Sequence, residues 1–202
     1  MDDPHDLRHR PDALATRGGK SIQEAVQCLK LGDISGLETL VMCYQAKAVR
    51  IAFLIMQDEP AAEDIVQDTF IRIYRNIRSF DQTRPFEPYL MQSVVYAALN
   101  NARQMARTVS LDDDPTLVEA LLARAASPEA QVEGGQLAQE ILAALSKLTP
   151  RQRAAIVQRY YLEMSEKEMA EALRSAPGTV KWLLNSARSR LRSLLRPERS
   201  IK

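Results

Sequence analysis

The chain of 202 residues is poor in the residue types on which most catalytic and metal sites depend. It has two histidines, His5 and His9, and two cysteines, Cys28 and Cys43. Both histidines lie at the start of the chain and neither cysteine belongs to a CxxC pair, so the ligand spacing of zinc sites is missing. A glycine-rich phosphate loop and paired carboxylates beside a nucleophile are missing too. These absences argue against an enzyme, a metalloprotein or a disulfide scaffold, and no cofactor is expected.

Long apolar runs are also lacking. The longest, Ile51 to Met56, falls far short of the roughly 20 residues that cross a bilayer, and residues 1–20 have no apolar centre of a signal peptide. A hydrophobic content of 46% nevertheless suffices for one or two buried cores at this length. We therefore expect a soluble, cytoplasmic protein without stable membrane insertion.

A net charge of +1 hides an uneven distribution along the chain. Residues 137–202 carry thirteen basic and six acidic side chains, whereas residues 107–136 carry two basic and six acidic ones. Clustered basic charge is typical of nucleic-acid binders, because phosphate neutralisation supplies much of their affinity. The last third of the chain is therefore the predicted nucleic-acid-binding part.

Apolar residues recur at helical spacing over most of the chain, and no stretch alternates convincingly as a strand would. Helices are predicted from Ile22, from Leu37 with Ser35 as the cap, from the pair Glu59-Pro60, and from Phe86 to about Arg107. The fold class is therefore all-α. We expect a disordered tail (1–20), a four-helix domain (21–107), a flexible acidic linker with at most one short helix at Leu117–Ala125 (108–136), and a second small helical domain (137–197).

The stretch Ser165–Leu195 has the pattern of a helix-turn-helix. Ser165 and Glu168 form a capping box, and Ser175 is the predicted cap of a second helix after the break at Arg174–Pro177. The apolar stripe of that second helix is Val180, Leu184, Ala187, Leu191 and Leu194. In a DNA reader the outward residues of this helix meet base edges in the major groove; an ordinary helical hairpin is the alternative. The outward residues predicted here are Thr179, Lys181, Trp182, Asn185 and Ser186.

The order of the motifs AAEDIVQDTFIRIYRNIRSF, RPFEPYLMQSVVYAALNNARQ, an acidic linker and LSKLTPRQRAAIVQRYYLEMSEKEMAEALRSAPGTVKWLLNSARSRLRSLL resembles bacterial extracytoplasmic-function sigma factors of the sigma-70 family. The resemblance covers residues 21–106 and 137–195. It implies a region 2-like and a region 4-like domain that bind core RNA polymerase, direct it to promoter DNA and help to open the duplex.

By this resemblance Glu63, Asp64 and Asp68 dock on the clamp helices of the largest polymerase subunit, and the polymerase flap is a further contact. Acids near a helix start also complement its dipole, which is an alternative reason for Glu63 and Asp64. Asp68 lies two turns into the helix, where the dipole explains less.

The resemblance also implies that the fourth helix and the loop before it hold the minus-ten element as a single strand. The sequence departs from the family here. It has Gln92, Val95 and Tyr96 at places where the family is usually rich in Arg with a central Asn, and an acid, Glu87, after Phe86. We therefore expect weak or partner-dependent melting, and a partly buried helix with ordinary polar positions is the alternative. The candidate contacts are Tyr89, Gln92, Tyr96, Asn100, Asn101 and Arg103.

The helix-turn-helix is the implied reader of the minus-thirty-five element. Arg188, Arg192 and Arg196 are four residues apart and could follow phosphates, although cations also complement the end of a helix. The pair Trp182-Leu183 is unusual for the family, and its predicted exposure suggests that a protein, an anti-sigma factor or another regulator, covers this face. The candidate contacts are Ser175, Thr179, Lys181, Trp182, Asn185, Ser186, Arg188 and Arg192.

In the family the linker runs toward the RNA path of the polymerase, so Asp112, Asp113 and Asp114 could occupy space meant for RNA, or could simply keep a linker soluble. The sequence predicts a sigma factor. The alternatives are an adaptor that binds polymerase or a regulator without independent promoter recognition, and a plain helix-turn-helix repressor, against which the acidic helix argues.

Overall fold

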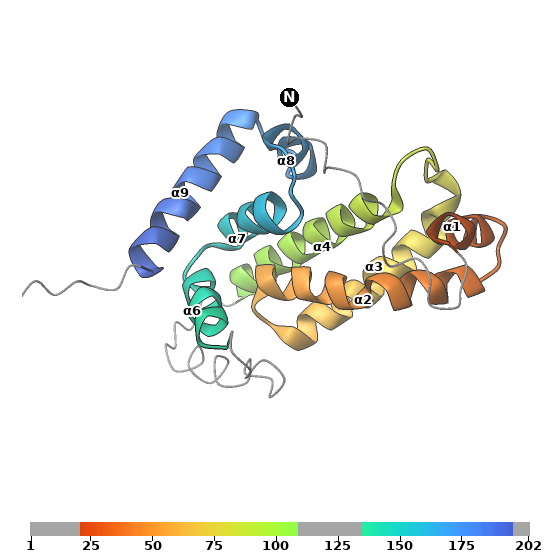
Figure 1. Cartoon of the computed structure of the whole chain (residues 1–202), viewed down its shortest axis with the longest axis horizontal. Coiled ribbons are helices and arrows are strands. Elements are labelled where there is room, and N and C mark those ends of the chain that lie inside the picture. The colour runs from red at the N-terminus through yellow and green to blue at the C-terminus, as the bar shows by residue number, and fades with distance from the viewer. Residues whose placement is uncertain (1–20, 109–134, 196–202) are drawn as a thin grey trace, which may run out of the picture.

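The computed structural model describes residues 21–108 and 135–195, and every regular element in these two ranges is helical, which confirms the all-α prediction (Figure 1). The tail, the acidic triplet, the predicted helix at 117–125 and Arg196 lie outside the described residues. The elements are α1 (Ile22–Lys30), α2 (Ser35–Met56), α3 (Glu59–Asn76), the 3-10 turn η1 (Ile77–Ser79), α4 (Phe86–Thr108), α6 (Gly135–Ser146), α7 (Pro150–Ile156), the π-helical segment η3 (Val157–Tyr161), α8 (Glu166–Ala172) and α9 (Pro177–Leu195).

Several helix starts follow from local capping. The Asp58 carboxylate accepts from the Ala61 amide at 3.0 Å, and Pro60 suits the first turn, so α3 begins at Glu59 as predicted. The predicted cap Ser35 is wrong. It is the first residue of α2, one position after the cap position, and its amide donates to the Asp33 carboxylate at 2.9 Å, which satisfies one of the free amides at the helix start.

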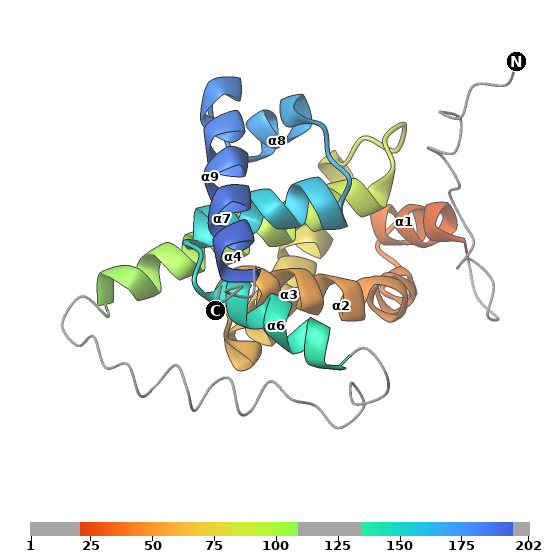
Figure 2. The ribbon, with the colours of Figure 1, turned by 60° about the vertical axis from the view of Figure 1, so that its left-hand side comes forward.

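The first domain is organised around α2, which packs against α1, α3 and α4 (Figures 1 and 2). By length and composition α2 could cross a membrane. Its apolar side chains instead supply the centre of the core, where Ile51 and Ile55 are fully buried beside Leu90 of α4. Burying each such side chain contributes about 1.5–3 kcal/mol. The apolar run in the sequence is therefore explained by this core.

The second domain consists of α6 to α9. Met169 of α8 and Val180 and Leu184 of α9 are completely buried together, which gives the helix-turn-helix its own small core. The apolar stripe predicted for α9 is confirmed except at Leu194, which is 45% exposed. The contacts that cover α9 from α6 and α7 end at Leu191.

Between α7 and α8 the helix widens into the π turn η3, which the sequence pattern did not reveal. Gln158 lies in this turn and is completely buried, yet neither polar atom of its amide has a hydrogen-bond partner within the protein. A buried polar group without a partner costs about 1–3 kcal/mol. The burial of the Gln158 amide in this turn therefore lowers the stability of the fold.

The two domains pack against each other through α7, which lies between α4 and the helix-turn-helix in both views (Figures 1 and 2). Ala154 and Val157 of the second domain belong to the core cluster of the first. In return, Leu54 of α2 packs on the cluster formed by α6 and α9. The described residues therefore form one packed unit.

A buried cation joins the domains. The Arg153 Nε donates to the Ile55 carbonyl at 2.6 Å, and its Nη1 donates to the Leu148 carbonyl at 2.7 Å. Ile55 lies in the last turn of α2, where carbonyls lack partners within the helix and attract cations. Burial lowers the pKa of Arg153 to about 10, so its guanidinium remains charged at neutral pH. Arg153 therefore caps a helix of the other domain.

Gly36 permits the close crossing of α1 and α2. A Cβ added to Gly36 would lie 2.1 Å from the Ala25 carbonyl oxygen, whereas one added to Gly178 of α9 would meet nothing within 4 Å. We expect Gly36→Ala to lower the free energy of unfolding by about 1–3 kcal/mol, because the helices must separate. Gly178→Ala should leave it unchanged or raise it by up to about 1 kcal/mol. Urea unfolding monitored by circular dichroism measures both, and equal stability of the two variants would contradict this packing.

Candidate functional site

The three acids proposed for docking lie on α3 with exposed side chains. Asp64 and Asp68 are one helical step of four apart and share a stripe with Ile71, which is 44% exposed. The buried side of α3, including Val66 and Phe70, faces the core. Sequence reasoning missed Ile71, although its spacing of three from Asp68 places it beside the acids. The stripe therefore combines negative charge with an apolar centre.

On α4, Gln92, Tyr96, Asn100 and Arg103 recur at three and four residues and share one face. Tyr96 is 41% exposed, and its hydroxyl is hydrogen-bonded with the Asn100 side chain. This bond, followed by the positive charge of Arg174, lowers the pKa of Tyr96. Four of the six candidates are thus brought together as a polar, aromatic stripe.

The other two candidates differ. Asn101 follows Asn100 by a turn of about 100°, which takes it off the stripe, and its Oδ1 is buried without a hydrogen-bond partner. Tyr89 is half-buried, with its ring centroid 4.8 Å from that of Phe80, so it is largely part of an aromatic cluster. Asn101 therefore lies on a different side of α4 from the polar, aromatic stripe. Tyr89 is fixed by its packing against other aromatic rings.

Glu87, the acid that departs from the family pattern, forms an ion pair with a lysine of α2. Its carboxylate accepts from the Lys47 ammonium of α2 at 2.5 Å, and the same ammonium lies 5.9 Å from the centre of the Tyr161 ring of η3. The ion pair is partly exposed and is worth little stability on its own. Its effect is to offset a negative charge near the start of the proposed DNA-binding helix α4.

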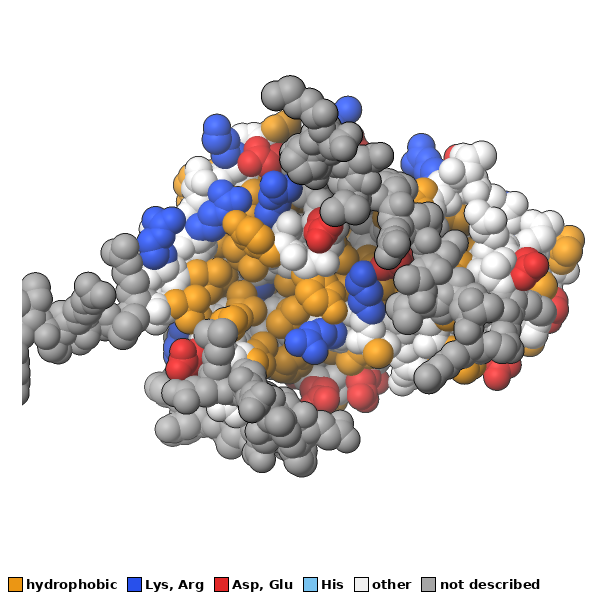
Figure 3. Space-filling model, viewed as in Figure 1, with side chains coloured by type: hydrophobic (Ala, Val, Ile, Leu, Met, Phe, Trp, Pro, Cys, Tyr) orange, Lys and Arg blue, Asp and Glu red, His pale blue; other side chains and the backbone are white. Residues whose placement is uncertain are grey.

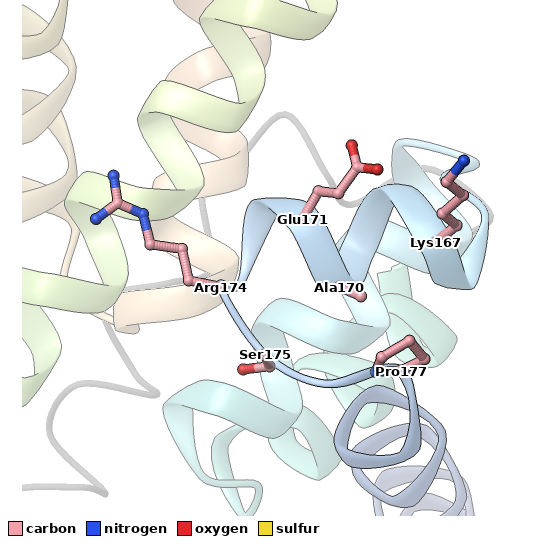
Figure 4. Close-up of a pocket in the computed structure, with 6 residues that line it drawn as sticks. All are labelled: Lys167, Ala170, Glu171, Arg174, Ser175 and Pro177. Atoms are coloured by element: carbon pink, nitrogen blue, oxygen red, sulfur yellow. The ribbon is translucent and has the colours of Figure 1, made fainter.

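The first helix of the helix-turn-helix, α8, begins as the sequence predicts. The Ser165 hydroxyl accepts from the Glu168 amide, and the Glu168 carboxylate accepts from the Ser165 hydroxyl and amide, so α8 begins with a capping box. The hydrogen bond from the Ser165 hydroxyl is the main cause that lowers the pKa of Glu168. Figure 4 shows the open hollow at the following turn, lined by Lys167, Ala170, Glu171, Arg174, Ser175 and Pro177 (Figure 4).

Ser175 was predicted to cap the second helix, and this prediction is wrong. Its hydroxyl donates to the Leu173 carbonyl at 3.0 Å and accepts from Arg151 at 3.2 Å, while α9 begins at Pro177. Arg174 adopts the left-handed region at φ 47° in this turn. The Ser175 hydroxyl and amide then donate to the Leu173 and Ala170 carbonyls, which lack partners at the end of α8. Ser175 therefore shapes the turn.

Lys181, Asn185 and Arg192 of α9 are exposed and lie on one face, spaced by four and seven residues. Thr179 and Trp182 are exposed as well, rotated about the helix axis by about 100° or more from Lys181, and Trp182 is 65% accessible. The prediction that Leu183 shares this exposure is wrong. It is buried against the core of the helix-turn-helix, because a rotation of about 100° from Trp182 turns it inward.

Two candidates on α9 are held by the rest of the domain. The Ser186 hydroxyl accepts from the Gln152 amide of α7 at 2.9 Å. The Arg188 Nε donates to the Tyr160 hydroxyl at 2.7 Å, with the guanidinium 5.6 Å from the centre of that ring. Arg188 is therefore a preoriented cation, and Ser186 is partly committed to packing.

Basic side chains gather along α9, next to an apolar area over the neighbouring elements (Figure 3). The large hydrophobic residues with high exposure in this half of the described chain include Ile141 of α6, Tyr160 and Tyr161 of η3, and Leu195 of α9. Among residues 21–108 and 135–195, no group of three or more His, Cys, Asp or Glu is arranged to hold a metal ion. The surface features that stand out are therefore charge and exposed apolar area.

Comparisons with known proteins agree with this arrangement. The sigma-70 region 2 model matches residues 40–108, and the sigma-70 region 4 model matches residues 138–191. The sigma factor SigW of Bacillus subtilis is 30% identical over 181 residues, which cover 87% of this chain and 97% of SigW. The chain belongs to the extracytoplasmic-function RNA polymerase sigma factors.

A second sigma factor of Bacillus subtilis, SigM, is 28% identical over 78% of this chain and 94% of its own length. Solved structures share the fold at 22% identity. They are CnrH in complex with the cytosolic domain of CnrY (TM-score 0.58, 86% of this chain and 96% of that chain) and RpoE in complex with the anti-sigma factor NepR from Bartonella quintana (0.60, 80% and 98%). The protein is thus a factor that directs core RNA polymerase to promoters, and the adaptor alternative is not favoured.

Proposed function

We propose that the acidic stripe of α3 docks this sigma factor on the clamp helices of the largest polymerase subunit, with the flap as a further contact of region 4. The observation that carries the proposal is the exposure of Asp64, Asp68 and Ile71 on a single stripe whose opposite side is buried. An apolar centre with charged neighbours is the usual composition of a protein interface. Glu63 lies beside this stripe with its side chain exposed.

Reversing the charge at the docking stripe should weaken polymerase binding. We expect the double variant Asp64→Arg/Asp68→Arg to bind core polymerase about 10- to 100-fold more weakly at roughly 0.1 M salt, because like charges then oppose each other across the interface. Fluorescence anisotropy with labelled sigma factor measures the affinity. The single variant Asp68→Arg is compared with Glu59→Arg as the matched control, since Glu59 is exposed on the same helix but off the stripe. Equal losses in both variants would contradict the proposed surface.

We propose further that the stripe on α4 holds one strand of the minus-ten element. Tyr96 offers a face on which a base can stack, Gln92 and Asn100 offer amide groups to base edges, and Arg103 can meet a phosphate. Asn101 is left out because its side chain lies off the stripe. The pairing of Glu87 with Lys47 removes one source of repulsion near this strand.

Loss of the exposed aromatic ring should weaken single-strand binding. We expect Tyr96→Ala to reduce the affinity of the polymerase complex for a minus-ten single strand by about 5- to 100-fold, since stacking of a base on an aromatic ring contributes about 1–3 kcal/mol. Met105→Ala is the control, because Met105 is similarly exposed on α4 but lies on the opposite side. A Tyr96→Ala complex that binds the strand as tightly as wild type contradicts the stacking role.

For the minus-thirty-five element we propose that Lys181 and Asn185 meet base edges in the major groove while Arg188 and Arg192 meet phosphates. Tyr160 presents Arg188 in a fixed orientation, which lowers the entropy lost on binding. Thr179, Ser175 and Ser186 border this surface and contribute polar groups at its edge. We also propose that this sigma factor acts in the cytoplasm, together with core polymerase.

Substitution of two arginines on α9 can distinguish a direct phosphate contact from a general effect of positive charge on DNA binding. We expect Arg192→Ala to reduce the slope of log affinity against log salt by about one for duplex minus-thirty-five DNA, because one phosphate contact is lost. Arg190→Ala removes the same charge from an exposed position on another side of the helix and should leave the slope unchanged. Filter binding at several salt concentrations measures both slopes, and indistinguishable slopes would contradict the proposed face.

We propose that Trp182 meets a regulatory protein of the anti-sigma class rather than DNA. Two relatives of the same fold were solved with protein partners, the cytosolic domain of CnrY and the anti-sigma factor NepR. An exposed tryptophan beside a basic stripe is a typical anchor for a protein interface. In the same DNA titration, Trp182→Ala should bind within about twofold of wild type. A loss above about tenfold would make Trp182 a base contact, as expected for an apolar group against a thymine methyl.

A further inference from the structure

An exposed tyrosine and an arginine from two different elements lie together at the edge of the recognition helix. The Arg188 Nε of α9 donates to the Tyr160 hydroxyl of η3 at 2.7 Å. Because an arginine cannot accept a hydrogen bond, the phenolic hydrogen of Tyr160 and the Nη groups of Arg188 are left to donate elsewhere. Within the described residues neither side chain has a further hydrogen bond or an ion pair. The pair therefore presents donors that an external acceptor can fill.

Arg188 lies on the border between the exposed and the buried side of α9. It shares the exposed stripe with Asn185 and Arg192, three and four residues away, whereas Leu184 is completely buried. Tyr160 lies alongside this border with a side chain that is 59% exposed. When a recognition helix lies in the major groove, groups at its edges and on neighbouring elements meet the phosphates that flank the groove. The pair is therefore placed where the DNA backbone would pass.

The π turn is the local cause of this placement. The Leu162 amide donates at 3.0 Å to the Val157 carbonyl, five residues earlier, so the turn is wider than a turn of α-helix. Residues 159–161 are all exposed, while the Gln158 amide is buried without a hydrogen-bond partner among the described residues. A local conformation with such a cost motivates a functional hypothesis, and here the turn presents Tyr160 to α9.

Resting on the minus-thirty-five binding proposed above, we propose that Tyr160 and Arg188 form a clamp for one phosphate of the DNA backbone. The Arg188 Nη groups and the Tyr160 hydroxyl donate to the same phosphate, while the bond between the two side chains fixes their orientation. Hydrogen bonds to a charged acceptor are the stronger ones, and donors that are already oriented lose less freedom on binding. The clamp reads no base, but it fixes the register of α9 in the groove. Tyr160 is thus a DNA contact from outside the helix-turn-helix.

The next residue in the π turn supplies a matched control. Tyr161 is 38% exposed, and its ring centre lies 5.9 Å from the Lys47 ammonium of α2. Its ring therefore contacts the first domain, whereas the Tyr160 ring contacts α9. Tyr161→Phe removes the same hydroxyl group one position away from the proposed clamp. Tyr160→Phe keeps an exposed ring and should fold like wild type.

Uncharged phosphate analogues test the clamp. Phosphates beside the minus-thirty-five element of a promoter duplex are replaced one at a time by methylphosphonates, and the affinity of the polymerase complex is measured for each duplex. We expect Tyr160→Phe to bind the fully charged duplex about 3- to 10-fold more weakly than wild type, because a hydrogen bond is lost. At one neutralised position the two proteins should bind within about twofold of each other, since the clamp has lost its phosphate there. Tyr161→Phe should match wild type on every duplex.

Two results overturn the clamp directly. One is wild-type affinity of Tyr160→Phe for the charged duplex, and the other is a loss in Tyr160→Phe that is the same at every neutralised position. The Arg188→Ala background then separates a direct contact from orientation of the arginine alone. In that background we expect Tyr160→Phe to cost a further factor of about two or more, because the hydroxyl still donates to the phosphate. No further loss shows that Tyr160 only orients Arg188, and this also overturns the clamp.

The same measurements distinguish the clamp from the function on which it rests. If Lys181→Ala and Arg192→Ala weaken binding while Tyr160→Phe does not, minus-thirty-five binding by α9 stands and the clamp alone is wrong. If the wild-type complex binds duplexes with and without the minus-thirty-five element equally well, α9 does not read that element. The proposed function then fails together with the clamp.

Discussion

The burial of a single guanidinium between two domains is the constraint on which the rest of the structure depends. Arg153 bonds the end of α2 and the turn before α7 at the same time, so it sets where the second domain sits on the first. A buried cation is tolerated only where acceptors meet it, and the free carbonyls at a helix end are such acceptors. The apolar contacts of Ala154 and Val157 follow from that placement.

The packing of α7 against the first domain decides which of the proposed functional surfaces are exposed and which are contacted by the other domain. The acidic stripe of α3 and the outer face of α9 remain exposed in the packed arrangement. The stripe on α4 is touched by Arg174. The surface of α4 proposed to hold single-stranded DNA therefore contacts the turn before α9 in the packed arrangement.

Several parts of the candidate site could be predicted because they depend on local rules. The capping boxes, the proline starts and the apolar stripes are set by residues within one or two turns, so helix bounds and the family resemblance followed from them. The exposure of Leu183 was mispredicted because it depends on the rotation of α9 against its neighbours. Ser175 was mispredicted as a cap because its hydroxyl bonds within the turn and α9 begins two residues later, at Pro177. Ile71 was missed although its spacing of three from Asp68 is visible in the sequence, whereas the π turn has no local sequence signal.

The sequence by itself determined the all-α class, the order of the two domains, the acidic and basic division of charge and the family, because each depends on spacing along the chain. Only the tertiary structure decided that the domains pack together, that Glu87 is paired with Lys47, and that Arg174 reaches Tyr96. These pairs join residues 40 or more positions apart. Such contacts depend on how the helices pack in three dimensions, which helical periodicity cannot specify.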